Sequence, residues 1–167
     1  MLMLLWDYEM APERDNLGKF SPAQRLALAV TAIDWTLKTM SPPIQDEATV
    51  TFLEKALTVC RQAVAEGRDS VPAQPELVES FDDVYEGTDE PGTAHLLSAV
   101  MDCCEASDGL SAKELYYILS YCYEGALDRE DIPNVDIDVE RSNERCISVI
   151  QYQRNLIRKK IEEISAT

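Results

Sequence analysis

Residues that commonly carry enzyme chemistry are scarce in this sequence. The single histidine, His95, lies on a predicted helix opposite its apolar stripe, where we expect it to be solvated rather than catalytic or metal-binding. A Ser–His–Asp or Cys–His site would need this residue. The 6 glycines form no G-x-x-x-x-G-K or G-x-G-x-x-G pattern, which excludes the common nucleotide-binding loops. The sequence therefore predicts no catalytic residues, and only an enzyme that uses carboxylates alone stays open.

Metal-ligand patterns are absent as well. Cys103 and Cys104 are adjacent, which on a helix turns their thiols about 100° apart, and neither C-x-x-C nor Glu-x-x-His occurs. Counted from Asp128, a calcium loop would need glycine at the sixth position and glutamate at the twelfth, where the chain has Pro133 and Val139. We expect no metal and no cofactor. The cysteines are expected to fill the core as small apolar residues: Cys60, Cys103, Cys104, Cys122 and Cys146.

Signals for export or membrane insertion are also missing. The opening stretch, MLMLLWDYEM, has an apolar run too short to span a membrane, with no basic residue before it and acids directly after it. The odd number of cysteines, 5, in a chain without an export signal fits a reducing compartment. We therefore expect a cytoplasmic protein.

Basic residues are outnumbered about two to one. The chain has 15 Lys and Arg against 31 Asp and Glu, a net charge of −16. A field of this sign repels phosphate backbones and anionic headgroups, so neither nucleic acid nor a membrane surface is an expected ligand. The same field would steer a basic protein toward this one. The alternative is that the acidity only keeps the protein soluble.

Helix signals recur along the chain, and strand signals do not. Ser21 with Gln24 and Ser111 with Glu114 form capping boxes, and apolar residues follow at three- and four-residue spacing. The helix after Ser21 is apolar on two sides, which predicts a central place in a bundle. We predict an all-α, single-domain bundle of about six helices over residues 1–167, with an irregular N-terminal segment at 1–20 and an acidic inter-helix loop at 128–136. The predicted helices span 21–40, 46–66, 75–87, 92–107, 112–127 and about 136–164.

Two acid-rich segments, 79–90 and 124–144, lie close to predicted helix ends. On the helix between them, Tyr117, Tyr121 and Glu124 share the side opposite the apolar stripe. Exposed tyrosines beside carboxylates are typical of interface hot spots. The alternatives are a plain solvated surface, or tyrosines that pack beneath another helix. The predicted partner-binding residues are Asp82, Asp83, Glu86, Tyr117, Tyr121, Glu124, Asp128, Glu130, Asp131, Asp136 and Asp138.

The helix pair SPAQRLALAVTAIDWTL and VTFLEKALTVCRQAVAEG resembles the opening of immunity proteins from bacterial toxin systems. Proteins of that group are small, strongly acidic, all-helical and cytosolic, without catalytic motifs. The resemblance covers roughly the first third of the chain, with no residue-by-residue assignment. It implies tight binding of a basic partner, a cognate toxin, with acids that occlude its active site. The alternative is a non-catalytic structural or regulatory subunit that associates through apolar helix faces. Salt-insensitive association or a stable homodimer in solution would be the sign of that alternative, and a homo-oligomer is possible.

Overall fold

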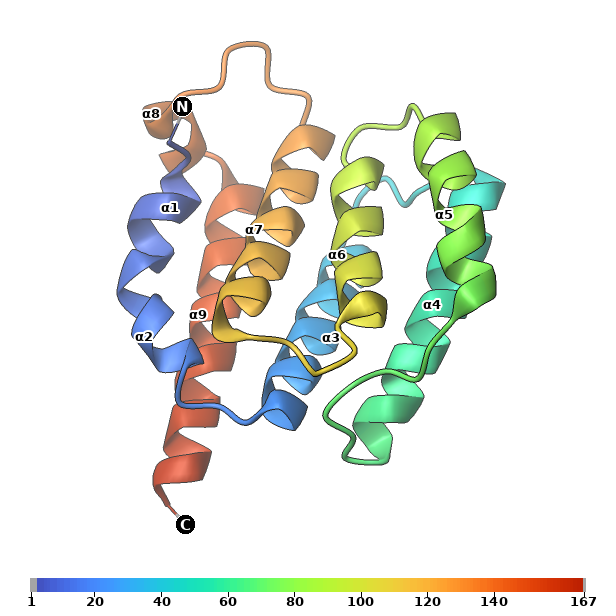
Figure 1. Cartoon of the computed structure of the whole chain (residues 1–167). Helices are drawn as coiled ribbons and strands as arrows, with labels where there is room; N and C mark the ends of the chain where they lie inside the picture. Colours follow the sequence, from blue (N-terminus) through green and yellow to red (C-terminus); the bar gives the residue numbers. More distant parts are fainter. Residues whose placement is uncertain (1–2, 167) are drawn as a thin grey trace.

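The computed structural model describes residues 3–166, and all regular structure in that range is helical (Figure 1). The all-α prediction is confirmed. The elements are α1 (Leu5–Met10), a 3-10 turn η1 (Ala11–Glu13), α2 (Arg14–Leu17), α3 (Pro22–Lys38), α4 (Glu47–Ala65), α5 (Pro75–Gly87), α6 (Thr93–Glu105), α7 (Ala112–Arg129), α8 (Ile137–Arg141) and α9 (Glu144–Ser165). Five of the six predicted helices correspond to α3–α7, and the sixth is divided in two. The count of about six is too low because of this division and because short helices precede α3.

Both predicted capping boxes are present. The backbone N–H of Gln24 donates to Ser21 Oγ at 3.2 Å, and the N–H of Ser21 donates back to Gln24 Oε1 at 2.9 Å. The N–H of Glu114 donates to Ser111 Oγ at 3.0 Å, and the N–H of Ser111 donates to Glu114 Oε1 at 3.1 Å. Each box satisfies two backbone donors that a helix start leaves free, so α3 and α7 begin where their sequences place them.

Helix α3 occupies the centre, as its two apolar sides predict. It contacts α4, α6, α7 and α9. Leu26 and Leu28 point to different sides of the helix and are both buried. Trp35, which is half-buried, stacks on Tyr152 of α9 with ring centroids 4.0 Å apart. Figure 1 shows α4 and α5 on one side of α3, and α1 and α2 on the other, against α9.

The segment 1–20, expected to be irregular, is helical from Leu5 to Leu17, interrupted by a 3-10 turn that contains Pro12. Residues 1 and 2 lie outside the described range. These helices are too short to be stable alone, and tertiary packing holds them, since Leu5, Trp6 and Leu17 are buried. A pattern of one or two turns carries too few apolar positions to indicate a helix period.

The C-terminal part also differs from the prediction. Helix α7 continues through Arg129, so the loop expected at 128–136 begins at about residue 130. The long helix expected from Asp136 is divided into α8 and α9. Asn143 causes the division, because its side chain accepts the backbone N–H of Cys146 at 2.9 Å and so caps a new helix.

Helices α6 and α7 approach each other closely at two glycines. Gly92, with φ of 85°, caps the start of α6 and faces Gly125 of α7. A Cβ atom on Gly92 would lie 2.2 Å from the carbonyl oxygen of Gly125. The absence of side chains at both positions lets the two backbones touch, which places the outer faces of α6 and α7 side by side.

Candidate protein-binding surface

The outer faces of α6 and α7, with one residue of α5, form a surface of aromatic rings and carboxylates. Helical spacing aligns its members, since positions three, four and seven residues apart share one side of a helix. Tyr117 and Tyr85 are 46% and 41% exposed, and Tyr121 lies partly buried between helices. We call it the tyrosine–carboxylate surface: Tyr85, His95, Asp102, Tyr117, Tyr121 and Glu124.

Tyr121 lies at the centre of this surface. Its ring centroid is 6.5 Å from that of His95. Burial raises the pKa of its hydroxyl, and the charges of Asp102 and Glu124 raise it further. The three predicted α7 residues, Tyr117, Tyr121 and Glu124, therefore do share one side of the helix. Of the two tyrosines, Tyr117 is exposed and Tyr121 is only partly so.

His95 is less solvated than its sequence position suggests. It is partly exposed, and its Nδ1 lies 3.9 Å from Glu124 Oε2. Burial raises the pKa of the Glu124 carboxyl, while His95 opposes that rise. The separation of this pair is longer than a hydrogen bond.

Asp102 is the most perturbed carboxyl of the surface. Burial, and then the nearby charges of Glu105 and Glu114, raise its pKa to about 6. Among the described residues, both charges that shift this pKa are negative, so neither stabilises an ionised Asp102. Sequence reasoning missed Asp102 as a site residue, although its position seven residues after His95 places both on one side of α6.

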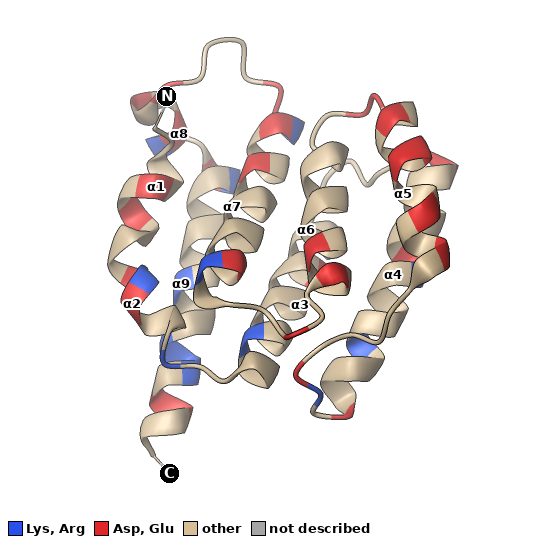
Figure 2. Ribbon diagram, viewed as in Figure 1, with Lys and Arg blue, Asp and Glu red and all other residues tan. Residues whose placement is uncertain are grey.

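Among the α5 acids, Asp82, Asp83 and Glu86 are exposed, as expected. They flank Tyr85, whose ring packs against Phe81 with centroids 5.4 Å apart. Figure 2 shows acidic residues along α5. Helix α5 packs on both α4 and α6, and these carboxylates lie within three positions of Tyr85 along that helix.

The acids predicted between Asp128 and Asp138 divide into two groups. Three have structural contacts: Asp128 accepts the N–H of Gly92 at 2.8 Å, Glu130 accepts Nδ2 of Asn143 at 3.1 Å, and Asp136 caps α8 by accepting the N–H of Val139 at 2.9 Å. The other two accept none of these hydrogen bonds: Asp131, which has a positive φ, and Asp138, which lies 3.6 Å from Arg141. Exposure does not separate the groups, because Asp128 and Asp136 are exposed as well.

Glu90, at the end of the acid-rich segment 79–90, has a structural role that the sequence did not reveal. Its carboxylate pairs with Arg129 at 3.0 Å and accepts the backbone N–H groups of Gln45 and Asp46. Arg129 also donates to the carbonyl oxygens of Pro42 and Pro43. The cluster fastens the loops before α4 and α6 to the end of α7.

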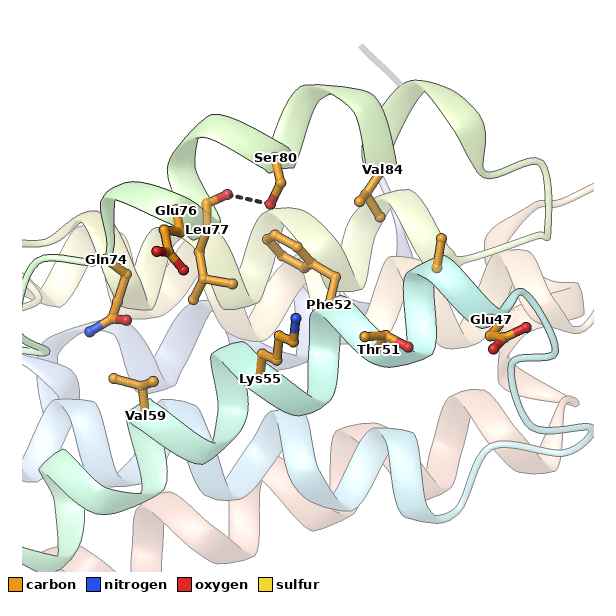
Figure 3. A pocket seen from close by; sticks show the side chains of 11 residues that line it. Glu47, Thr51, Phe52, Lys55, Val59, Gln74, Glu76, Leu77, Ser80 and Val84 are labelled. Carbon is orange, nitrogen blue, oxygen red and sulfur yellow. Dashed lines mark hydrogen bonds between the residues drawn. The ribbon is translucent and has the colours of Figure 1, made fainter.

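A groove of about 780 Å³ separates α4 from α5 (Figure 3). In that view Phe52 and Lys55 point from α4 toward α5, and Leu77 points back from α5. Val59 and Val84 complete an apolar lining, and carboxylates stand at the edges. Sequence reasoning could not find this groove, because it exists only once two helices are paired.

Within residues 3–166, no group of three or more His, Cys, Asp or Glu side chains is arranged to hold a metal ion. The same range contains no helix whose length and apolarity would allow it to cross a membrane. No protein-family model, curated protein or solved structure matches this chain.

Proposed function

We propose that this protein is a binding protein that inhibits a basic toxin or effector in the cytoplasm, in the manner of an immunity protein. The observation that carries the proposal is the tyrosine–carboxylate surface, where Tyr117 and Tyr85 are 46% and 41% exposed beside carboxylates of α6 and α7. Tyrosine gives a large, rigid contact area, and its hydroxyl finds a polar partner at the edge of an interface.

The proposed mechanism is occlusion of a cationic active site. Arginine and lysine side chains that bind a toxin's anionic substrate would pair instead with Asp102 and Glu124, while Tyr117 and Tyr121 fill adjacent clefts. The pKa of Asp102, raised to about 6 by burial and by neighbouring acids, supports this assignment, because a cation there relieves the repulsion. Asp82, Asp83, Glu86, Asp131 and Asp138 would form the outer, screened part of the interface.

Charge would govern the rate of association. With a net charge of −16, the protein attracts a basic partner over a distance comparable to the Debye length. Association should therefore be fast at low salt and slower as salt increases. Dissociation depends instead on the buried tyrosine contacts, so salt should affect it little.

A second candidate function is a non-catalytic subunit that associates through apolar helix faces. The apolar α4–α5 groove, with Phe52, Val59 and Leu77 among its lining residues, favours this alternative (Figure 3). Association through the groove would be insensitive to salt, and a homodimer would be visible in solution by light scattering or sedimentation.

The test is capture of the partner from native host cells, followed by kinetics. The purified partner is measured against wild type, Tyr117→Ala and Tyr8→Ala, in a series of salt concentrations. Tyr8 is a matched control, since it is 52% exposed but lies on α1. We expect Tyr117→Ala to weaken binding by about 10-fold or more and Tyr8→Ala to leave it unchanged. A salt-independent on-rate, or equal effects of the two variants, would contradict the proposal.

A further inference from the structure

Two cysteines from different helices lie against each other in the core. Cys60 of α4 and Cys104 of α6 have their Sγ atoms 3.7 Å apart. Their residues are 0% and 6% exposed. The two helices pack directly on each other, so the backbone fixes the proximity (Figure 1). Core filling alone requires a small apolar side chain at each position, and does not require two thiols in contact.

One of the two thiols borders an open surface groove. Cys104 lines a groove of about 680 Å³ together with Val71, Pro72 and Val78. Cys60 is fully buried behind it. A small solute in the groove would therefore meet Cys104 first, and Cys60 only through Cys104.

The hydrogen bond between the thiols gives them different acidities. Donation from the Cys60 S–H lowers the pKa of Cys104, although burial and the charge of Glu105 oppose this. The same hydrogen bond, with burial, raises the pKa of Cys60. Cys104 is thus the thiol that ionises first, and the thiolate is the nucleophilic form. The accessible sulfur and the more acidic sulfur are the same atom.

We propose that Cys60 and Cys104 form a redox-active dithiol that a peroxide oxidises to a disulfide. The Cys104 thiolate attacks one oxygen of hydrogen peroxide and breaks the O–O bond. The product is a sulfenic acid, and the departing hydroxide takes up the Cys104 proton as water. Cys60 sulfur then attacks the sulfenic sulfur, which breaks the S–O bond and releases hydroxide, and this combines with the Cys60 proton as a second water. Two thiols lose two electrons, and one peroxide gains them.

Closing the bond requires the sulfurs to move from 3.7 Å to about 2.05 Å. The disulfide would join α4 to α6 and enclose α5 in a covalent loop, because the two cysteines are 44 positions apart. Cross-linking of that kind restricts the unfolded chain. The oxidised protein should therefore unfold at a higher temperature than the reduced protein.

The test is a peptide map of the wild-type protein after oxidation. Reduced protein at low concentration is treated with hydrogen peroxide, its remaining thiols are alkylated in denaturant, and the digest is analysed by mass spectrometry. We expect 2 of the 5 thiols to be lost, with Cys60 joined to Cys104, and both to return after treatment with dithiothreitol. A map in which both cysteines are still alkylated, or in which Cys104 joins another cysteine or a second chain, would overturn the proposal.

Single-cysteine variants show which thiol reacts with peroxide and which one resolves the sulfenic acid. In Cys60→Ser the sulfenic acid of Cys104 has no resolving thiol, so dimedone should label Cys104. In Cys104→Ser no disulfide should form. Cys122→Ser is the matched control, because Cys122 is also fully buried but lies on α7, and it should oxidise as wild type does. Dimedone labelling of Cys60 rather than Cys104 would reject the assignment. The wild-type map decides the main proposal even if a variant fails to fold.

Discussion

The indole N–H of Trp6 donates a 2.7 Å hydrogen bond to the side-chain oxygen of Gln153, and both residues are 1% exposed. The amide nitrogen of Gln153 in turn donates to the carbonyl oxygen of Leu119 at 3.0 Å. A single buried glutamine thus connects α1, α7 and α9. Polar groups in a core are stabilising only when they are hydrogen-bonded, so this residue has a structural role on the otherwise apolar face of α9.

Gln153→Met should lower the free energy of unfolding by about 1–3 kcal/mol, because the buried indole N–H of Trp6 loses its acceptor while the volume is nearly kept. Urea titration followed by circular dichroism measures the change. Gln151→Met is the control, since Gln151 is exposed on the same helix, and it should change stability by less than about 0.5 kcal/mol. Equal effects of the two substitutions would show that the hydrogen bond is unimportant.

Glu90→Gln should also destabilise the protein, by about 2 kcal/mol, because Arg129 is only 7% exposed and would lose its charged partner. The difference should depend on pH. Burial disfavours ionisation of Glu90, but Arg129 and the N–H groups of Asp46 and Gln45 outweigh it and lower the pKa below 4.5. A lowered carboxyl pKa stabilises the fold above the unfolded-state pKa, and this contribution is lost as pH falls through the folded-state value.

Wild type and Glu90→Gln should consequently differ most near neutral pH and converge well below pH 4.5. Unfolding by urea at several pH values gives this comparison. Glu79→Gln, on the exposed side of α5, is the control and should show little difference at any pH. A gap between wild type and Glu90→Gln that stays constant down to acid pH would rule out the ionic contribution.

Asp102→Asn should stabilise the protein at neutral pH, whereas Glu90→Gln should destabilise it. Burial and the charges of Glu105 and Glu114 raise the pKa of Asp102 from 3.8 to about 6, so the folded protein holds this proton more tightly than the unfolded chain. Wild-type stability should therefore fall as pH rises from 3.8 to about 6. At neutral pH the variant should be more stable by about 1–2 kcal/mol. Thermal unfolding of wild type and Asp102→Asn across this pH range tests the prediction. Asp108→Asn is the control, because Asp108 is exposed. If Asp102→Asn is no more stable than wild type at neutral pH, the prediction is wrong.

Gly92→Ala should destabilise the protein by about 2–4 kcal/mol, through a positive φ and through contact with the backbone of α7. The added Cβ would lie 2.2 Å from the carbonyl oxygen of Gly125, so α6 and α7 must separate. Gly87→Ala is the control, because a Cβ there meets nothing within 4 Å. Chemical denaturation compares the two, and a tolerated Gly92→Ala would mean that the helices do not need this close approach.

The long helices could be predicted because their signals are local. The capping boxes at Ser21 and Ser111, and the spacing of apolar residues after them, act within a few turns of the chain. Helices α1 and α2 could not be predicted, because distant residues stabilise them. The division at Asn143 had a local signal, an N-cap residue followed by Glu144, that the continuous apolar pattern concealed.

The candidate site shows the same difference between features set by local sequence and features set by distant residues. Tyr117, Tyr121 and Glu124 could be grouped from helical spacing alone. Whether a carboxylate is exposed depends on partners far along the chain, as with Glu90 and Arg129, which are 39 positions apart. Charge runs in a sequence therefore mix residues that hold loops together with residues that face solvent.

The N-terminal helices depend on the C-terminal ones for their contacts. The backbone N–H of Leu5 donates to the buried carboxylate of Glu140 at 3.1 Å, and Trp6 is fastened to Gln153. On a ribosome, α1 and α2 therefore emerge long before the residues of α8 and α9 that cover them have been synthesised. Nascent chains would carry Leu5 and Trp6 uncovered, as a binding site for chaperones that recognise apolar segments. Helix α1 is therefore made before α8 and α9, but it reaches its native place only after they have been made.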